Sequence, residues 1–376
     1  MVTLPATLDR LLNANEPREL TIATSDPALL RLPWELMADA AGSLALRVSV
    51  RRQLGTETEI SGARFHRAEH VENVLHVRKK TVISVPVLEV RGKLAARGEK
   101  LPLRILYIVS RPEDAGFIDP RVTTKALFAA LDPLGTNVKL DFCRPPTLAR
   151  MEAMLREAQQ AGDSYDVVHF DGHGTFLPQQ QIGALCFEQT DDGSGESKTD
   201  LIPADQLGNL FADVRIPLVV LEACRSAQMK TIVFRSVAPR LIQAGVGSVL
   251  SMGHAVHVEA AKILLDRFYR ELVCGTTIGH AVAQGRKALV ATPTRWLEYG
   301  PGARTLKLQD WFLPHLYQRG LDDPLLPAQH PGERLGVSPP CPRAAELPIH
   351  GGLTPCRSPR QFDVFLSHNH NDSARV

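Results

Sequence analysis

The sequence predicts an α/β fold with a mostly parallel central sheet and helices on both of its faces. Two observations carry this prediction. Short apolar runs rich in β-branched residues, such as 165–170 and 217–221, are typical of buried strands in a parallel sheet. Segments with helical periodicity, about 10–15 residues long, separate these runs, which indicates βαβ units.

The first hundred residues contain short pieces that are typical of strands, at Glu19–Ala23, Leu44–Val50 and Thr81–Val90. We expect this region to be an α/β part that belongs to the following core or packs on it. The sequence leaves open whether it forms a subdomain of its own or the first part of a larger sheet.

Strands and helices alternate from residue 101 to about residue 320, where we expect the core domain. Thr147 is expected to cap a helix that Gly162 closes. The expected strands are Leu103–Val109, Val138–Phe142, Tyr165–Phe170, Pro217–Leu221 and Gly247–Met252. The expected helices are Thr123–Leu131, Leu148–Gln160, Ala204–Phe211, Ser236–Ala244, Val258–Leu272 and Ile278–Val290.

The composition changes after about Leu321. The segment 321–360 is rich in proline and has no clear periodicity, so it reads as a linker. A new apolar run begins at Gln361, and the sequence ends at residue 376. So few residues cannot bury a core, and we expect 361–376 to be the first strand of a second domain.

The charge balance argues against several classes of partner. Lys and Arg number 43 against 41 Asp and Glu, which gives a net charge of +2 and no support for binding to nucleic acid or a membrane surface. The six cysteines form no CxxC pair, and we find neither a signal peptide nor a long uncharged apolar run. We therefore expect a soluble, cytoplasmic protein with reduced thiols.

Two reactive side chains follow two of the predicted strands. His173 comes after the run 165–170, and Cys224 comes 51 positions later, after the run 217–221. Ligands bind at the carboxyl ends of the strands in such sheets, so we expect both side chains at one rim. A thiol beside an imidazole predicts a cysteine nucleophile with a histidine base.

The neighbours of these two residues fit the same chemistry. Gly172 and Gly174 flank His173, which suits a tight turn, and the cation of Arg225 favours a thiolate at Cys224. In the expected reaction, His173 takes the thiol proton and Cys224 attacks a peptide carbonyl. The amides of Gly174 and Cys224 hold the oxyanion, and His173 then protonates the leaving amine.

A metal site is the main alternative, because His169 and His173 form an HxxxH pattern. On a strand, positions four apart are about 13 Å apart, too far for one ion. We expect no metal and no cofactor; His169 then packs within the strand, while His254 and His257 line or flank the site. The chain has no GxSxG, Walker A or GxGxxG motif.

The segments His169-Phe-Asp-Gly-His-Gly174 and Leu221-Glu-Ala-Cys-Arg-Ser-Ala227 resemble the caspase-like cysteine proteases, although Glu222 and Ser226 replace the Gln and Gly of the caspase signature. The wider resemblance, over about residues 30–320, is to CHAT domains of the same fold. The further segments that carry it are Leu32–Leu36, Leu103–Pro112, Ala244–Val249, Phe268–Leu272, Ala281–Leu289 and Asp310–Pro314.

The resemblance implies a caspase-like sheet with His173 and Cys224 as the catalytic dyad and Gly174 as an oxyanion donor. Related domains often have an acidic pair after the strand that ends at Met252, and Glu259 is its remaining member here. We assign substrate binding to Arg225, Glu259 and His254.

The segment Phe362–His368 resembles the opening strand of a TIR domain, with Asp372 near its first helix. This resemblance implies a fused TIR module through which the protein self-associates or meets an activating partner, in signalling or bacterial defence. The NAD-cleaving glutamate of such a domain would lie beyond residue 376.

Two functions follow. The first is an intracellular CHAT-type cysteine endopeptidase, a hydrolase that acts on a protein or peptide. The second is a catalytically silent CHAT scaffold that relays assembly to a TIR effector. The intact His/Cys pair favours the enzyme.

Overall fold

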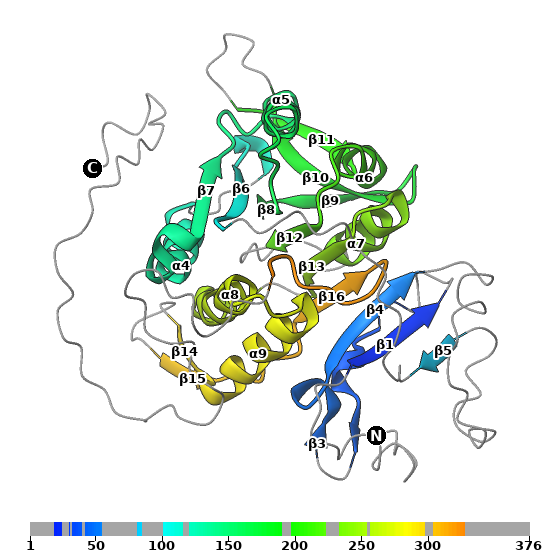
Figure 1. Ribbon diagram of the computed structural model, residues 1–376, viewed down its shortest axis with the longest axis vertical. Coiled ribbons are helices and arrows are strands. Elements are labelled where there is room, and N and C mark those ends of the chain that lie inside the picture. The colour runs from blue at the N-terminus through cyan, green and yellow to red at the C-terminus, as the bar shows by residue number, and fades with distance from the viewer. Residues whose placement is uncertain are drawn as a thin grey trace, which may run out of the picture.

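A computed structural model describes residues 19–24, 30, 32–39, 42–54, 81–84, 101–115, 120–189, 197–222, 233–253, 256–297 and 304–327. Within these ranges the chain forms one nine-stranded sheet in the order β5-β1-β4-β16-β13-β12-β8-β6-β7 (Figure 1). Its strands are β1 (Glu19–Thr24), β4 (Ser49–Leu54), β5 (Thr81–Ser84), β6 (Leu103–Ser110), β7 (Val138–Phe142), β8 (Val167–Gly172), β12 (Leu218–Glu222), β13 (Ser248–Met252) and β16 (Pro314–Gln318).

Most neighbouring strands of this sheet run parallel. β7, β6, β8, β12 and β13 are parallel to one another, and so are β1, β4 and β16. The antiparallel pairs are β13 with β16 and β1 with β5. The predicted α/β class with a mostly parallel sheet is confirmed.

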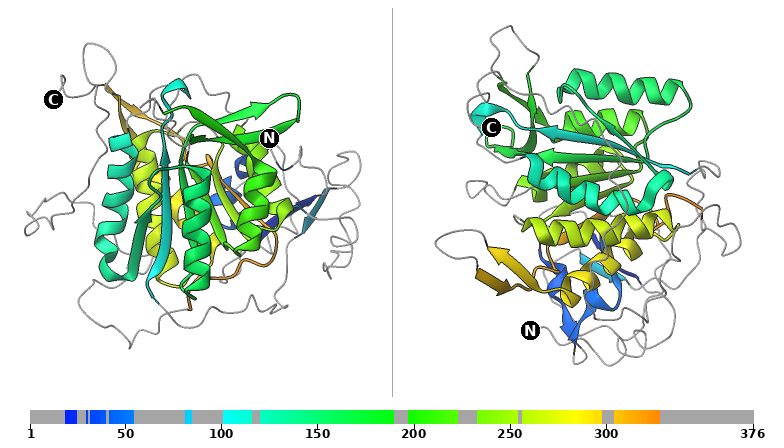
Figure 2. Two further views of the ribbon diagram at one scale, coloured as in Figure 1. Left: turned by 90° about the horizontal axis from the view of Figure 1, so that it is seen from above. Right: turned by 90° about the vertical axis from the view of Figure 1, so that its left-hand side faces the viewer.

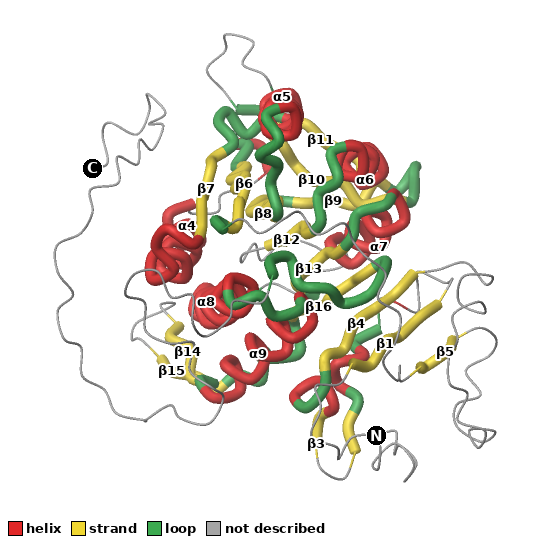
Figure 3. Tube along the Cα trace, viewed as in Figure 1, coloured by secondary structure: helices red, strands yellow, loops and turns green. Residues whose placement is uncertain are grey.

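Helices cover both faces of the sheet (Figures 1 and 2). On one face are α5 (Leu148–Gln160), α6 (Ala204–Asp213) and α7 (Val233–Ala244). On the other are α4 (Pro120–Leu131), α8 (Val258–Val273) and α9 (Ile278–Ala291). Figure 3 shows the strands as a layer between these two groups of helices.

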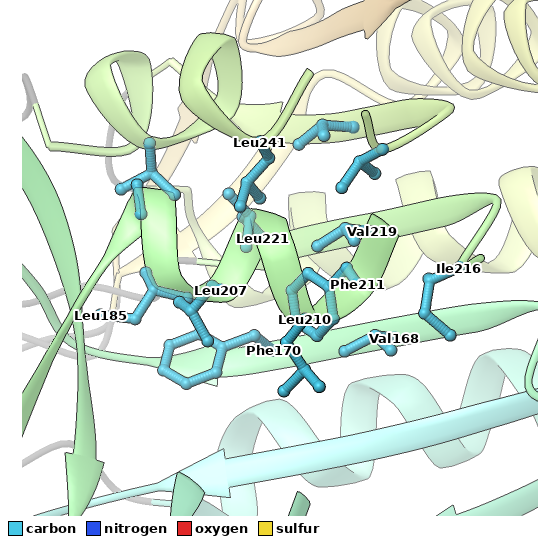
Figure 4. Close-up of a cluster of buried hydrophobic side chains, with 14 of the residues drawn as sticks. Val168, Phe170, Leu185, Leu207, Leu210, Phe211, Ile216, Val219, Leu221 and Leu241 are labelled. Carbon is cyan, nitrogen blue, oxygen red and sulfur yellow. The ribbon is translucent and has the colours of Figure 1, made fainter. Parts of the chain in front are cut away.

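The alternation of side chains along β8 and β12 explains both cores. Val168 and Val219 point into the core under α5, α6 and α7, whereas Val167 and Val220 point into the core under α4, α8 and α9. Figure 4 shows the first core, where Phe170 of β8 and Leu221 of β12 lie with side chains of α6 and α7. Both runs are apolar because both of their faces are buried.

The N-terminal strands continue the same sheet, since β4 pairs with β16 and β1 with β4. The predicted strand Leu44–Val50 is wrong in its first half. Leu44–Leu46 is the 3₁₀ helix η2, which buries Leu44 and Ala45, and the strand begins only at Ser49. Of the predicted strand Thr81–Val90, the structure describes Thr81–Ser84 as β5, and the rest lies outside the described residues.

Smaller sheets surround the main one. β9 (Gly174–Leu177), β10 (Ile182–Glu188) and β11 (Thr199–Pro203) form an antiparallel sheet directly after β8. The remaining small sheets pair β14 (Thr294–Leu297) with β15 (Arg304–Lys307) and β2 (Ala38–Asp39) with β3 (Gly42–Ser43). At the end of the described chain, Pro324 forms a bridge to Thr277 and Leu326 is buried in the core.

Candidate active site

The carboxyl ends of β8 and β12 lie side by side. Their parallel register runs from Val167 opposite Leu218 to Asp171 opposite Glu222. His173 follows Asp171 by two residues, and Cys224 follows Glu222 by two residues but lies outside the described part of the chain. Two residues of chain reach at most about 7.6 Å from Cα to Cα. The expectation that the strands leading to the two residues are neighbours is confirmed.

His173 lies between β8 and β9, and its side chain is only 3% exposed. Its carbonyl oxygen accepts a hydrogen bond of 2.9 Å from the amide of Cys186, which fixes its backbone to β10. The flanking glycines do not form the expected tight turn, because Gly172 belongs to β8 and Gly174 begins β9. A Cβ at Gly172 would lie 2.7 Å from the ring of Phe170, so glycine here permits close packing.

Asp171 is fully buried two residues before His173, and three donors hold it. Arg111 Nη2 lies 2.6 Å from its Oδ1, and Arg111 Nη1 donates to its main-chain oxygen at 2.6 Å. Tyr107 on β6 donates its hydroxyl to Oδ2 at 2.9 Å. Burial and the carboxylates of Asp171 and Glu222 raise the pKa of Tyr107 well above its ordinary value, so its hydroxyl keeps the proton.

His169 lies one step back on the same face of β8 and bridges two other elements. Its Nε2 is 3.0 Å from Oε2 of Glu222 on β12, and its Nδ1 is 2.8 Å from the hydroxyl of Tyr269 on α8. Burial, with the charge of Glu222, raises the pKa of Tyr269 well above its ordinary value. We therefore assign the Tyr269 hydroxyl as donor to Nδ1 and the Nε2 proton as donor to Glu222. The expectation that His169 is a packed strand residue is confirmed.

These contacts form a buried polar layer that the sequence analysis missed. We name it the rim cluster: Tyr107, Arg111, His169, Asp171, Glu222 and Tyr269. A signal for it exists in the sequence, because His169, Asp171 and His173 occupy every second position of an otherwise apolar run. Such a pattern places His169 and Asp171 on one face of β8.

The other predicted site residues have different outcomes. Cys224, Arg225 and His254 lie outside the described residues. Glu259 is in the first turn of α8, where its amide donates to Nδ1 of His257, the N-cap, at 3.3 Å. An acid in this place is favoured by the helix dipole, and its role in substrate binding stays a prediction.

Other thiols and possible ligand groups lie apart from the rim cluster. Burial raises the pKa of Cys143 to about 12 and that of Cys186 to about 11, so neither is a reactive thiolate at neutral pH. In the described ranges, no three His, Cys, Asp or Glu side chains are grouped to hold a metal ion. The helices in those ranges are also too short or too polar to cross a membrane.

In comparisons with known proteins, the chain matches the model of one protein family. The model of the CHAT domain family matches residues 2–311, and no curated protein matches the chain significantly. The segment that resembles a TIR domain lies outside both this match and the described residues, so it stays a prediction.

Solved structures show weaker similarity. A chain of the Saccharomyces cerevisiae separase–securin complex matches with a TM-score of 0.37 and 14% identity, over 78% of this chain and 15% of that one. Caspase-1 from Spodoptera frugiperda matches with a TM-score of 0.34 and 11% identity, over 65% of this chain and 99% of that one. Similarity at this level carries no argument about activity.

Proposed function

Because the chain belongs to the CHAT domain family, we propose that it is a cysteine endopeptidase with Cys224 as nucleophile and His173 as base. The observation that supports this proposal best is the register of β8 and β12. It aligns Asp171 with Glu222, and the two reactive residues follow at equal distances along the two neighbouring strands. The same offset of 51 positions therefore relates the strand ends and the proposed dyad.

The proposed reaction proceeds through an acyl-enzyme. His173 accepts the proton of the Cys224 thiol, and the sulfur attacks a peptide carbonyl, with the amides of Gly174 and Cys224 as oxyanion donors. The tetrahedral intermediate collapses as His173 gives the proton to the leaving amine. Water then attacks the thioester, with His173 as base, and releases the acid product and the thiol.

The substrate in this proposal is a protein or peptide in the cytoplasm. Arg225, Glu259 and His254 are the proposed substrate-binding residues; of these, the structure describes Glu259, at the start of α8 after β13. A TIR module after residue 360 would couple the peptidase to self-association or to an activating partner, in signalling or defence.

Labelling with electrophilic peptides tests the proposal. We would treat the full chain with peptidyl acyloxymethyl ketones that carry Ala, Arg, Asp or Leu before the reactive group, and locate the adduct by mass spectrometry. We expect labelling of Cys224 that Cys224→Ala abolishes and that His173→Ala slows by at least about a hundredfold. Cys143 and Cys186 serve as internal controls because they are buried. Labelling of Cys224 at equal rates with and without His173 would contradict the proposal.

One observation favours a second function. His173 is almost fully buried, which suits a catalytically silent scaffold that relays assembly to a TIR effector. The two functions differ in one result. A scaffold would show no adduct at Cys224 with any of the four probes, including after oligomerisation or binding of a partner.

A further inference from the structure

We propose that Glu222 is a positioning residue, which acts through His169 to hold the end of β12 against the end of β8. This inference rests on the proposed function, because the residue that Glu222 positions is Cys224. Glu222 is fully buried and lies two residues before Cys224, on the strand that leads to it.

The need for such a link comes from two neighbouring buried acids. Asp171 and Glu222 are direct partners in the parallel register, so their side chains leave the same face of adjacent strands about 4.8 Å apart. Each of these buried carboxylates needs a hydrogen-bond partner, because an unpartnered buried carboxylate is costly.

The structure turns the two carboxylates to different partners. Asp171 is held from the β6 side by Tyr107 and Arg111. Glu222 instead reaches back to His169 on β8, whose direct register partner on β12 is Val220. The Glu222–His169 contact is therefore a diagonal side-chain link across the two strands that carry the proposed dyad.

Tyr269 makes this link rigid. Its hydroxyl contacts Nδ1 of His169 at 2.8 Å, and the ring centroids of the two residues are 6.1 Å apart in a stacked arrangement. The ring of Tyr107 packs edge-on to His169 with centroids 5.2 Å apart. The imidazole is fixed on both sides, so it presents Nε2 to Glu222 in one orientation.

We expect loss of the Glu222–His169 contact to change the alignment of the two strand ends more than the free energy of unfolding. A loss of the link leaves the backbone ladder of β8 and β12 in place but removes the side-chain contact between His169 and Glu222. A displacement of a reactive group by about 1 Å can lower the rate about a hundredfold. A small shift of the end of β12 would therefore weaken the proposed proton transfer between the Cys224 sulfur and the His173 imidazole.

The test follows the thiol itself. We would measure the rate at which iodoacetamide alkylates Cys224 in the full chain between pH 5 and pH 9, by mass spectrometry of the tryptic peptide 216–225. A sulfur paired with an imidazolium reacts at acidic pH, and an isolated thiol does not. We expect wild type to react at pH 6 at least about tenfold faster than His173→Ala.

Two substitutions at position 222 separate hydrogen bonding from size. Glu222→Gln keeps an oxygen that accepts from His169, and we expect its rate at pH 6 to stay within about threefold of wild type. Glu222→Leu keeps the volume without an acceptor, and we expect a loss of about tenfold. The matched control is Glu271→Gln, which removes a buried carboxylate paired with Arg267 elsewhere on the same face, with a change within about twofold expected.

Each outcome decides a specific point. Equal rates of Cys224 alkylation at pH 6 in wild type and His173→Ala would contradict the proposed dyad, and this inference with it. The inference alone would be overturned if His173→Ala slows alkylation as expected but Glu222→Leu reacts at the rate of wild type. It would also be overturned if Glu222→Gln and Glu222→Leu lower the alkylation rate equally. If Glu222→Leu does not fold, Tyr269→Phe decides: a loss of about threefold supports the link, and an unchanged profile overturns it.

Discussion

Two buried ionic clusters in this molecule differ in what they connect. The rim cluster joins neighbouring strands of the sheet at the candidate site. A second set of buried groups, here named the anchor cluster, joins the N-terminal region to the rest of the fold. Its members are Glu35, Arg52, Arg286 and His315.

The anchor cluster centres on one carboxylate. Both oxygens of Glu35 lie 2.5 Å from the guanidinium of Arg52 on β4, and Oε1 lies 3.1 Å from Nη2 of Arg286 on α9. Burial alone would raise the pKa of Glu35, but Arg52, His315 and Arg286 together lower it to about 2. Burial lowers the pKa of Arg286 to about 10, which leaves it charged at neutral pH.

The two clusters should therefore respond differently to the loss of a carboxylate. In the anchor cluster a single carboxylate serves two fully buried guanidinium groups from distant elements, so its loss leaves both without their counter-ion. In the rim cluster each carboxylate has its own partner, and the side chain of Arg111 is 12% exposed. We therefore expect the anchor cluster to control stability and the rim cluster to control alignment.

The largest expected effect comes from Glu35→Gln. Breaking a buried ion pair on one side costs about 3–5 kcal/mol, because the remaining cations stay buried. Urea unfolding followed by circular dichroism measures this loss. The control is Glu152→Gln, which breaks an exposed pair with Arg156 on α5 and should cost at most about 0.5 kcal/mol. Equal losses in the two variants would remove the special role of the anchor cluster.

A smaller loss is expected for Asp171→Asn in the rim cluster. Asp171 pairs with Arg111, whose side chain is 12% exposed, whereas Arg52 and Arg286 are fully buried, so we expect a cost of about 1.5–3 kcal/mol in the same unfolding assay. A loss as large as that of Glu35→Gln would contradict the distinction between the clusters.

The smallest expected effect is the loss of folding stability per pH unit as wild type is titrated with acid. The folded-state pKa of Glu35 is lowered from 4.5 to about 2, so its contribution to stability is complete above pH 4.5 and is lost as the pH falls towards 2. Between these values wild type should lose up to about 1.4 kcal/mol per pH unit more than Glu35→Gln. Parallel stability curves of the two proteins in this window would contradict the assignment.

The central strands and helices were predictable because the patterns that specify them lie within each segment of the sequence. Val138–Phe142 and Leu148–Gln160 have the predicted bounds, and Thr147 accepts the capping hydrogen bond from the amide of Arg150. It missed β16, which separates β13 from β4, because its partners are distant in sequence and its run is short. The strand expected at Leu44 failed because tertiary burial of an apolar triplet also suits a 3₁₀ turn.

The candidate site likewise has a part that the sequence predicted and a part that it did not. Spacing along the chain was enough to predict that the strand before His173 lies beside the strand before Cys224, because parallel strand ends meet at one edge. The partners of the rim cluster were not predictable in this way. Tyr269 lies one hundred positions after His169 in the sequence, on a helix packed on the sheet, and only the fold brings the two together.

The distance from the Cys224 sulfur to the nearer ring nitrogen of His173, measured in a crystal structure of the protein, would test the central claim most directly. We expect a distance of about 3–7 Å, with both groups on the α8 face of the sheet, since resting sites are often looser than reacting ones. A separation beyond roughly 10 Å, or a sulfur on the opposite face from the imidazole, would contradict it.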